Sequence, residues 1–289
     1  ILAGAGIEPL RERRTVGPAI IAGGAAVSGN PYPVSAIVDA VVLGEGERPI
    51  AGLCRAVEET AGAGKNGLLE TITGIEGVMP AGGRGRFARP ADPGSFPHSA
   101  VLSPQTAFPG VLLVEIARGC PGRCAFCLAT ALYGAYRPMP RERFAAILDL
   151  AAGKSNRAGL VSTAVAAHPD LAGLVNEAQA RGMVPAFGSL RAEDIDGETA
   201  GLIGGAGARS VALAPESGSE RLRALIGKRV ADVVYLDAAR LLAAAGVRRF
   251  TLYLLVGLPG EGNKTDEETG RFLAAFAAAA APAKTAVHV

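Results

Sequence analysis

The chain has 289 residues, more than a single hydrophobic core usually serves, so one large domain or two smaller ones are expected. Hydrophobic residues make up 49% and charged residues 19%, and the net charge of +2 gives no electrostatic case for binding nucleic acid or an anionic membrane. No apolar run approaches the roughly 20 residues that span a bilayer, and no signal peptide is visible at the start. The chain opens on Ile1 rather than Met and stops inside an apolar segment, which favours a piece of a longer protein.

The front of the chain has the pattern of an open α/β domain. Residues 18–24, "PAIIAGG", and 38–47, "VDAVVLGEGE", are typical of buried strands that end in glycine turns. Residues 48–62 have the spacing of an amphipathic helix, with a predicted apolar face of Ile50, Leu53, Cys54 and Val57. We predict part of a Rossmann-like domain over 1–79. Over 80–110 the composition changes to Gly, Pro, Arg and Ser, which predicts a linker.

From residue 111 onward, predicted strands alternate with predicted helices. The strands are expected at 111–117, 159–165, 183–189, 210–215, 249–257 and 285–289. The helices are expected at 140–152, 168–181, 196–204, 219–226, 231–245 and 265–280. Such alternation favours parallel strands joined by right-handed crossovers. The predicted fold class is therefore α/β, with a partial (β/α)6 TIM-like barrel over 111–289 preceded by the partial Rossmann-like domain.

Three of the four cysteines stand together in "VEIARGCPGRCAFCLAT", directly after the first strand of this series. Cys120, Cys124 and Cys127 have the spacing C-x3-C-x2-C, and thiolates are soft ligands that suit iron–sulfur clusters and zinc. Structural zinc normally takes four ligands. The remaining Cys54 lies far upstream, where it is expected to be a buried small apolar residue. Three thiolates on a four-iron cluster would leave one iron open for a small molecule.

At this motif the sequence resembles the radical S-adenosylmethionine (radical SAM) superfamily, whose hallmark is C-x3-C-x-aromatic-C after the first barrel strand; Phe126 supplies the aromatic residue. The resemblance implies that the three cysteines hold a [4Fe–4S] cluster whose open iron takes the amino and carboxylate groups of SAM. It also implies reductive cleavage of SAM to methionine and a 5′-deoxyadenosyl radical. A zinc knuckle and chance thiols are the alternatives. The clustered cysteines favour a reducing, cytoplasmic location.

Further segments extend the resemblance. "ALAPESGSERLRALIGK" is similar to the family's fourth strand, which implies that Glu216 approaches the SAM ribose; alternatively, this segment only caps the next helix. "YLLVGLPGEG" is similar to the fifth, which implies that Gly257 lets the backbone approach the adenine, although an ordinary turn fits equally well. "GSLRAED" is similar to the third strand end, where Ser189 or Arg191 would reach the SAM carboxylate, with a solvated arginine as the alternative.

The family's acidic glycine motif after the second strand, which contacts the SAM amino group, is missing. "VSTAVAAHPDL" occupies that place, and Ser162 and Thr163 are its nearby hydroxyls. The contact to the amino group is therefore unassigned.

The segment 20–47 is similar to the cobalamin-binding-type domain that precedes the barrel in one branch of the superfamily. Gly23 and Gly24 would face the nucleotide tail of cobalamin, or they form an ordinary strand–helix turn. No histidine precedes His98, so the Asp-x-His-x-x-Gly cobalt ligand of that branch is either absent or lies in a missing N-terminus. Cobalamin is therefore a hypothesis, together with methyl transfer or another C–H activation.

Two other functions remain open. A methylthiotransferase acting on tRNA or protein has a similar barrel, but its front domain carries three cysteines where this chain offers Cys54. A non-catalytic iron–sulfur or zinc module would bind metal without cleaving SAM. The radical SAM reading implies a small-molecule or peptide substrate and a one-electron donor such as flavodoxin or ferredoxin, and barrel folds do not specify which substrate.

Overall fold

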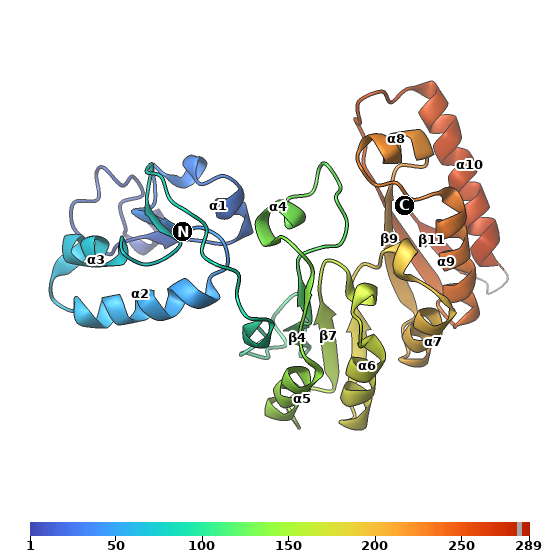
Figure 1. Cartoon of the computed structure of the whole chain (residues 1–289), viewed down its shortest axis with the longest axis horizontal. Helices are drawn as coiled ribbons and strands as arrows, with labels where there is room; N and C mark the ends of the chain where they lie inside the picture. The colour runs from blue at the N-terminus through green and yellow to red at the C-terminus, as the bar shows by residue number, and fades with distance from the viewer. Residues whose placement is uncertain (282–284) are drawn as a thin grey trace. The chain divides into compact units, whose positions relative to one another are not determined.

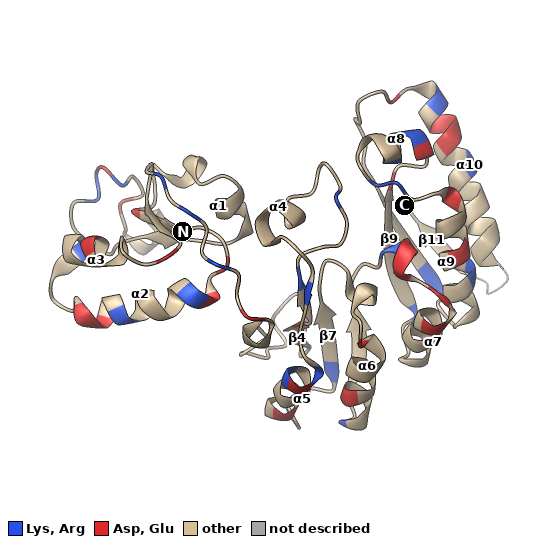
Figure 2. Ribbon diagram, viewed as in Figure 1, with Lys and Arg blue, Asp and Glu red and all other residues tan. Residues whose placement is uncertain are grey.

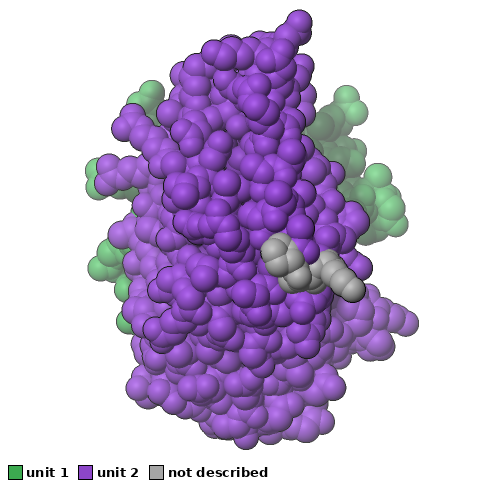
Figure 3. Space-filling view, turned by 90° about the vertical axis from the view of Figure 1, so that its right-hand side faces the viewer, with its two compact units in different colours: residues 1–95, 131–134 green, residues 96–130, 135–289 purple. Residues whose placement is uncertain are grey.

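The computed structural model describes the whole chain except residues 282–284, and the described residues form two compact units. The first unit contains residues 1–95 together with 131–134, and the second contains 96–130 and 135–289 (Figure 3). The domain limits derived from the sequence remain a prediction.

The first unit is built on a three-stranded sheet in the order β1-β2-β3, with bounds Ile21–Ala22, Ala40–Val42 and Val78–Pro80. Strands β1 and β2 are parallel, with Ile21 opposite Ala40, whereas β3 runs antiparallel to β2. The helices of this unit are α1 (Ala25–Gly29), α2 (Glu47–Glu59) and α3 (Gly64–Ile72) (Figure 1). The α/β character predicted for the front of the chain is thus present, with an antiparallel edge strand that the sequence pattern did not indicate.

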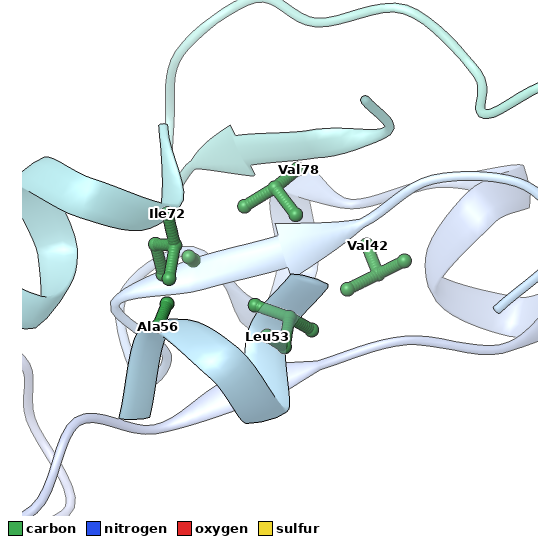
Figure 4. Close-up of a cluster of buried hydrophobic side chains, with 6 residues drawn as sticks. Val42, Leu53, Ala56, Ile72 and Val78 are labelled. Carbon is green, nitrogen blue, oxygen red and sulfur yellow. The ribbon is translucent and has the colours of Figure 1, made fainter. Parts of the chain in front are cut away.

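Both faces of the central strand β2 are buried, which explains its continuous apolar sequence. One face packs in a cluster of Ala40, Val42, Leu53, Ala56, Ile72 and Val78 (Figure 4). The other face packs with Val38, Val41, Leu43, Met79 and Ala81. The prediction that Cys54 is buried is wrong, because its side chain is exposed. The apolar face predicted for α2 is only partly in the core: Leu53 is 9% exposed, whereas Ile50 and Val57 are more than half exposed.

A buried ion-pair network ties the first unit together at Asp39. Its carboxylate lies 2.9 Å from Arg14 Nη2 and 2.7 Å from Lys65 Nζ, and it accepts a hydrogen bond of 2.8 Å from the Ile20 amide. The side chains of Arg14 and Asp39 are 1% and 2% exposed. Burial disfavours the charged carboxylate, but the Ile20 amide, Lys65 and Arg14 outweigh this effect and hold the pKa of Asp39 below its ordinary value.

The second unit contains the predicted series of parallel strands. Strands β4 (Leu112–Glu115), β7 (Arg157–Val161) and β8 (Val184–Phe187) form one parallel sheet. Strands β9 (Ser210–Glu216), β10 (Arg249–Leu254) and β11 (Ala286–His288) form a second parallel sheet. A parallel bridge between Leu190 and Leu213 connects the two sheets, and the Leu190 amide donates to the Ala212 carbonyl at 2.8 Å. Six parallel strands therefore follow one another in chain order.

Helices follow these strands along the chain (Figure 1). They are α5 (Arg141–Leu150), α6 (Leu171–Ala180), α7 (Gly197–Gly205), α8 (Glu220–Leu225), α9 (Asp232–Ala244) and α10 (Asn263–Ala280). Aromatic contacts fix the packing of α10: the Phe276 ring lies 5.4 Å from the Phe250 ring of β10, and the Phe272 ring lies 5.7 Å from the Tyr235 ring of α9. This arrangement confirms the predicted α/β fold class with its series of parallel β/α units, as part of a TIM-like barrel.

Within the described residues, no helix has the length and apolar composition needed to cross a bilayer. Helices α2 and α10 carry charged residues of both signs (Figure 2).

Replacing Asp39 tests the buried network of the first unit. Asp39→Asn leaves Arg14 buried without its counter-charge, so we expect the free energy of unfolding at pH 7 to fall by about 3 kcal/mol. Because the folded pKa is lowered, the contribution of Asp39 is present above the ordinary value of 3.8 and is lost as the pH falls below it. Urea unfolding should therefore show a large difference in the free energy of unfolding between wild type and variant at pH 7. The difference should be smaller at pH 3. The control Asp237→Asn, in an exposed pair with Arg240, should change stability little at either pH.

Candidate functional site

A small hairpin carries the cysteine loop of the second unit. Its strands β5 (Ala117–Arg118) and β6 (Arg137–Pro138) pair antiparallel, with Ala117 opposite Pro138. Arg118 is buried and donates to both carboxylate oxygens of Glu115, at 2.8 and 2.6 Å. The guanidinium of Arg118 lies 4.6 Å from the ring centre of the buried Phe96, and that of Arg137 lies 5.5 Å from it. Charge and packing thus fix the base of the loop.

The three predicted cysteines lie on this loop with free thiols. Cys120 and Cys124 are half-buried and Cys127 is exposed. The Gly122 amide lies 3.3 Å from Cys120 Sγ, and the Cys127 amide donates to the Cys124 carbonyl at 3.1 Å. In the part of the chain that the structure describes, no three His, Cys, Asp or Glu side chains are grouped so that they could hold one metal ion.

The cysteine loop is docked onto the turn that follows α8. The Ala125 amide donates to the Ile226 carbonyl at 2.8 Å. The next residue, Gly227, has a φ of +76°, and a Cβ atom there would lie 2.8 Å from the Arg123 carbonyl oxygen. Glycine is required twice over, for its left-handed backbone and for this close approach. On the other side, the Thr163 hydroxyl donates to the Gly119 carbonyl.

Glu216, the predicted ribose ligand, ends β9 beside this turn. With a φ of +66°, it is the one non-glycine residue of the described chain that has a left-handed backbone. Lys228 Nζ lies 3.3 Å from its Oε1 and also donates to the Ala214 carbonyl. The pairing of β9 with β10 is irregular here, and the Leu255 amide donates to the Glu216 carbonyl at 2.7 Å. A strained residue with a buried carboxylate at a strand end is a common feature of functional sites.

Arg223 fixes the segment between Glu216 and Lys228. Its side chain is fully buried and donates to the carbonyls of Ser217 at 2.7 Å and Val230 at 2.8 Å, and it pairs with Asp232. The guanidinium also lies 5.3 Å from the Phe272 ring centre. One cation therefore holds both ends of the segment.

Electrostatic interactions place Glu216, Lys228 and the cysteines in one neighbourhood. Burial raises the pKa of the Cys124 thiol, and the Lys228 ammonium partly opposes this shift. The other two thiols and the Glu216 carboxylate raise it further.

The remaining predicted residues of the second unit differ in their surroundings. Phe126 is 46% exposed on the cysteine loop, and Ser189 is exposed after β8. Arg191 Nη2 lies 2.6 Å from Glu193 Oε1, and its charge interacts with Cys120. Gly257, after β10, has a φ of +87° and its amide donates to Glu261. The roles predicted for these residues stay predictions.

Sequence reasoning missed two side chains of the site, Lys228 and Tyr136. Lys228 follows a turn glycine at a helix end, where lysine is common and signals nothing particular. Tyr136 donates from its hydroxyl to the Ala164 carbonyl at 2.8 Å, across the gap between the hairpin and the end of β7. Only the chain's path in space brings either residue to the cysteines.

The first unit has its own cavity, of about 700 Å³. It opens where β1 and β2 end, and the predicted residues Gly23 and Gly24 line it together with Gly44 and Gly46. Helix α2 completes it through Leu53, which also packs in the core, and through the exposed side chains of Ile50, Cys54 and Val57. The side chains that α2 does not bury in the core thus line a cavity.

Comparison with known proteins decides the family. The model of the radical SAM superfamily matches residues 114–273, and that of the N-terminal region of radical SAM proteins matches residues 1–80. The chain belongs to the radical SAM superfamily. Enzymes of this superfamily use a [4Fe–4S] cluster and SAM, as the resemblance at the cysteine motif implied. The chain is 27% identical over 258 residues to an uncharacterized protein of Methanocaldococcus jannaschii, covering 86% of this chain and 54% of that protein.

Two solved structures share the fold. The radical SAM methyltransferase TsrM from Kitasatospora setae, with cobalamin and a [4Fe–4S] cluster bound, has a TM-score of 0.65 and 19% identity over 88% of this chain and 54% of its own. The cobalamin-dependent radical SAM enzyme OxsB has a TM-score of 0.65 and 17% identity over 88% of this chain and 38% of its own. The present chain thus spans about half of the curated relative and of TsrM, and less of OxsB.

The docking of the cysteine loop can be tested at two glycines, Gly227 and Gly207. Each has a left-handed backbone conformation and each follows a helix. Gly227→Ala should cost about 1 kcal/mol of backbone strain and in addition push the cysteine loop away. Gly207→Ala, with a φ of +87° and open space around it, carries the strain alone. We expect alkylation of Cys124 by iodoacetamide, followed by mass spectrometry on reduced metal-free protein, to accelerate several-fold in Gly227→Ala only. Equal rates in both variants would mean that the turn does not hold the loop.

Proposed function

We propose that this chain binds a [4Fe–4S] cluster through Cys120, Cys124 and Cys127 and cleaves SAM reductively. The observation that carries the proposal is the loop itself: three thiols on one anchored loop, beside a strained carboxylate and a half-buried lysine. Membership of the radical SAM superfamily supports the same chemistry.

The residues present fit such a cluster. Thiolates are the preferred ligands of iron–sulfur clusters, and each of the three would bind a different iron. The Gly122 amide near Cys120 Sγ provides a hydrogen bond of the kind that tunes such clusters. The fourth cysteine, Cys54, belongs to the other compact unit.

Cys120, Cys124 and Cys127 would hold the cluster, which when reduced would supply the one electron needed to cleave the sulfur–C5′ bond of SAM to methionine and a 5′-deoxyadenosyl radical. The chain's own residues bind and orient the substrate. The Glu216 carboxylate accepts hydrogen bonds from the ribose hydroxyls, and Lys228 holds that carboxylate in place. Arg191 or Ser189 receives the SAM carboxylate, and the backbone at Gly257 approaches the adenine. A flavodoxin or ferredoxin would deliver the electron.

The first unit supports a second cofactor, cobalamin. Its cavity is mostly apolar and opens at the ends of parallel strands, where α/β domains bind nucleotides. Gly23, Gly24 and Gly46 leave room for the nucleotide tail beside the apolar face of α2. Residues 1–97 contain no histidine, so these residues offer cobalt no histidine ligand. Since TsrM and OxsB are described with cobalamin, methyl transfer to a small molecule or peptide is the reaction we propose.

Cluster loading and SAM cleavage are tested on anaerobically reconstituted protein. Wild type should carry about four irons per chain and form 5′-deoxyadenosine with dithionite and SAM. Cys120→Ala, Cys124→Ala and Cys127→Ala should each lose both properties, whereas Cys54→Ala should keep its iron. A stable cluster with intact SAM would instead indicate a non-catalytic binding module.

Cobalamin binding is tested by filling the cavity. Gly46 has an ordinary backbone and open space around it, so Gly46→Leu should fold normally while its side chain occupies the cavity. We expect binding of hydroxocobalamin, followed by gel filtration and absorbance, to weaken by about tenfold or more, as for a blocked apolar pocket. Gly4→Leu, in open space away from the cavity lining, is the control. Equal binding by wild type and both variants would rule out this cavity as the site.

A further inference from the structure

Two oppositely charged side chains lie at the end of β8, next to the cysteine loop. Arg191 precedes the short 3-10 helix η5 (Ala192–Asp194), and Asp194 ends it. Arg191 Nε lies 3.7 Å from Asp194 Oδ2, so the two charges attract each other without a hydrogen bond. Glu193 Oε1 accepts from Arg191 Nε at 3.1 Å and Nη2 at 2.6 Å and orients the guanidinium.

Each member of this pair keeps one buried polar atom without a hydrogen bond. Among the described residues these atoms are Arg191 Nη1 and Asp194 Oδ2. The side chains are 20% and 15% exposed, but these two atoms are themselves buried. Burial raises the pKa of the Asp194 carboxyl, and Arg191 offsets only part of that shift. The pair therefore lacks a hydrogen-bond donor for Asp194 Oδ2 and an acceptor for Arg191 Nη1.

The pair and the cysteine loop follow strands whose carboxyl ends lie at the same edge of the sheet. The Tyr136 hydroxyl, bound to the Ala164 carbonyl at the end of β7, interacts electrostatically with Asp194, Arg191 and Cys120 together. Arg191 also interacts directly with Cys120. The ends of β7 and β8 are adjacent because these strands are parallel neighbours. The pair therefore lies at the sheet edge to which the proposed function assigns the methionine part of SAM.

The hydroxyls that could contact the SAM amino group already form hydrogen bonds within the chain, and as neutral groups they accept more weakly than a carboxylate. Thr163 donates to the Gly119 carbonyl, and Ser162 accepts from the Ala164 amide at 3.1 Å. An ammonium or amine needs an acceptor, and a carboxylate is the strongest that a side chain offers.

We propose that Asp194 is the residue that accepts a hydrogen bond from the SAM amino group, while Arg191 receives the SAM carboxylate. The two side chains form a clamp for the amino-acid end of SAM, in place of the acidic glycine motif that the second strand lacks. This inference rests on the proposed function. It makes Asp194 a specificity-determining residue, because a ligand without the amino group leaves its carboxylate unpaired.

The test compares SAM with its analogue in which hydrogen replaces the α-amino group, on anaerobically reconstituted protein. Binding of each ligand is measured by isothermal titration calorimetry on wild type, Asp194→Asn and Glu198→Gln. Asp194→Asn keeps the side-chain shape and removes its charge. Glu198→Gln makes the same change in charge at an exposed position on α7. Iron content and circular dichroism show that the variants are loaded and folded.

We expect Asp194→Asn to weaken SAM binding by about tenfold or more, as for loss of a charged hydrogen bond, and to leave binding of the amine-free analogue within about twofold of wild type, because that ligand never made the contact. Glu198→Gln should alter neither affinity. If Asp194→Asn weakens the binding of both ligands equally, or does not change the binding of SAM, the assignment of Asp194 is overturned while the proposed function stands. Wild-type protein that loads a cluster but does not bind SAM overturns both.

Discussion

The contact on which the site depends is the docking of the cysteine loop on the turn after α8. A loop rich in glycine and proline has many conformations, and ordering it costs conformational entropy that thiols alone do not offset. Here the hydrogen bond from Ala125 to Ile226 and the close approach at Gly227 hold the middle of the loop. Arg118 stacked on Phe96 holds its base. The sulfurs are therefore presented from a fixed frame before any cluster binds.

The same turn connects the loop to the proposed substrate ligands. Lys228 comes directly after Gly227 and binds Glu216, whose left-handed backbone costs about 1 kcal/mol or more. Arg223 compensates for this cost by ordering the intervening segment, because it donates hydrogen bonds to the Ser217 and Val230 carbonyls at its two ends. A shift of this segment would move the cysteine loop and Glu216 together. Cluster binding and ribose binding are thus expected to be coupled through a single piece of backbone.

The sequence was most informative where a local pattern determines the outcome. Alternating apolar segments gave the parallel strands and most of the helices of the second unit, and three cysteines at fixed spacing gave the loop and the superfamily. It was least informative where contacts come from distant segments. The antiparallel strand β3 and the hairpin β5–β6 are too short to have a pattern. Cys54 was wrongly placed in the core because amphipathic spacing does not distinguish a face that packs on a sheet from one that lines a cavity. Lys228 and Asp194 gave no signal because their meaning depends on neighbours across the fold.

The account rests on an iron that the three thiolates leave open to SAM. Mössbauer spectroscopy of protein reconstituted with ⁵⁷Fe, recorded with and without SAM, tests this most directly. We predict that one of the four irons of a [4Fe–4S] cluster changes its isomer shift and quadrupole splitting when SAM is added, while the other three do not. A spectrum with four irons that are all insensitive to SAM, or the absence of a four-iron cluster, would contradict the account.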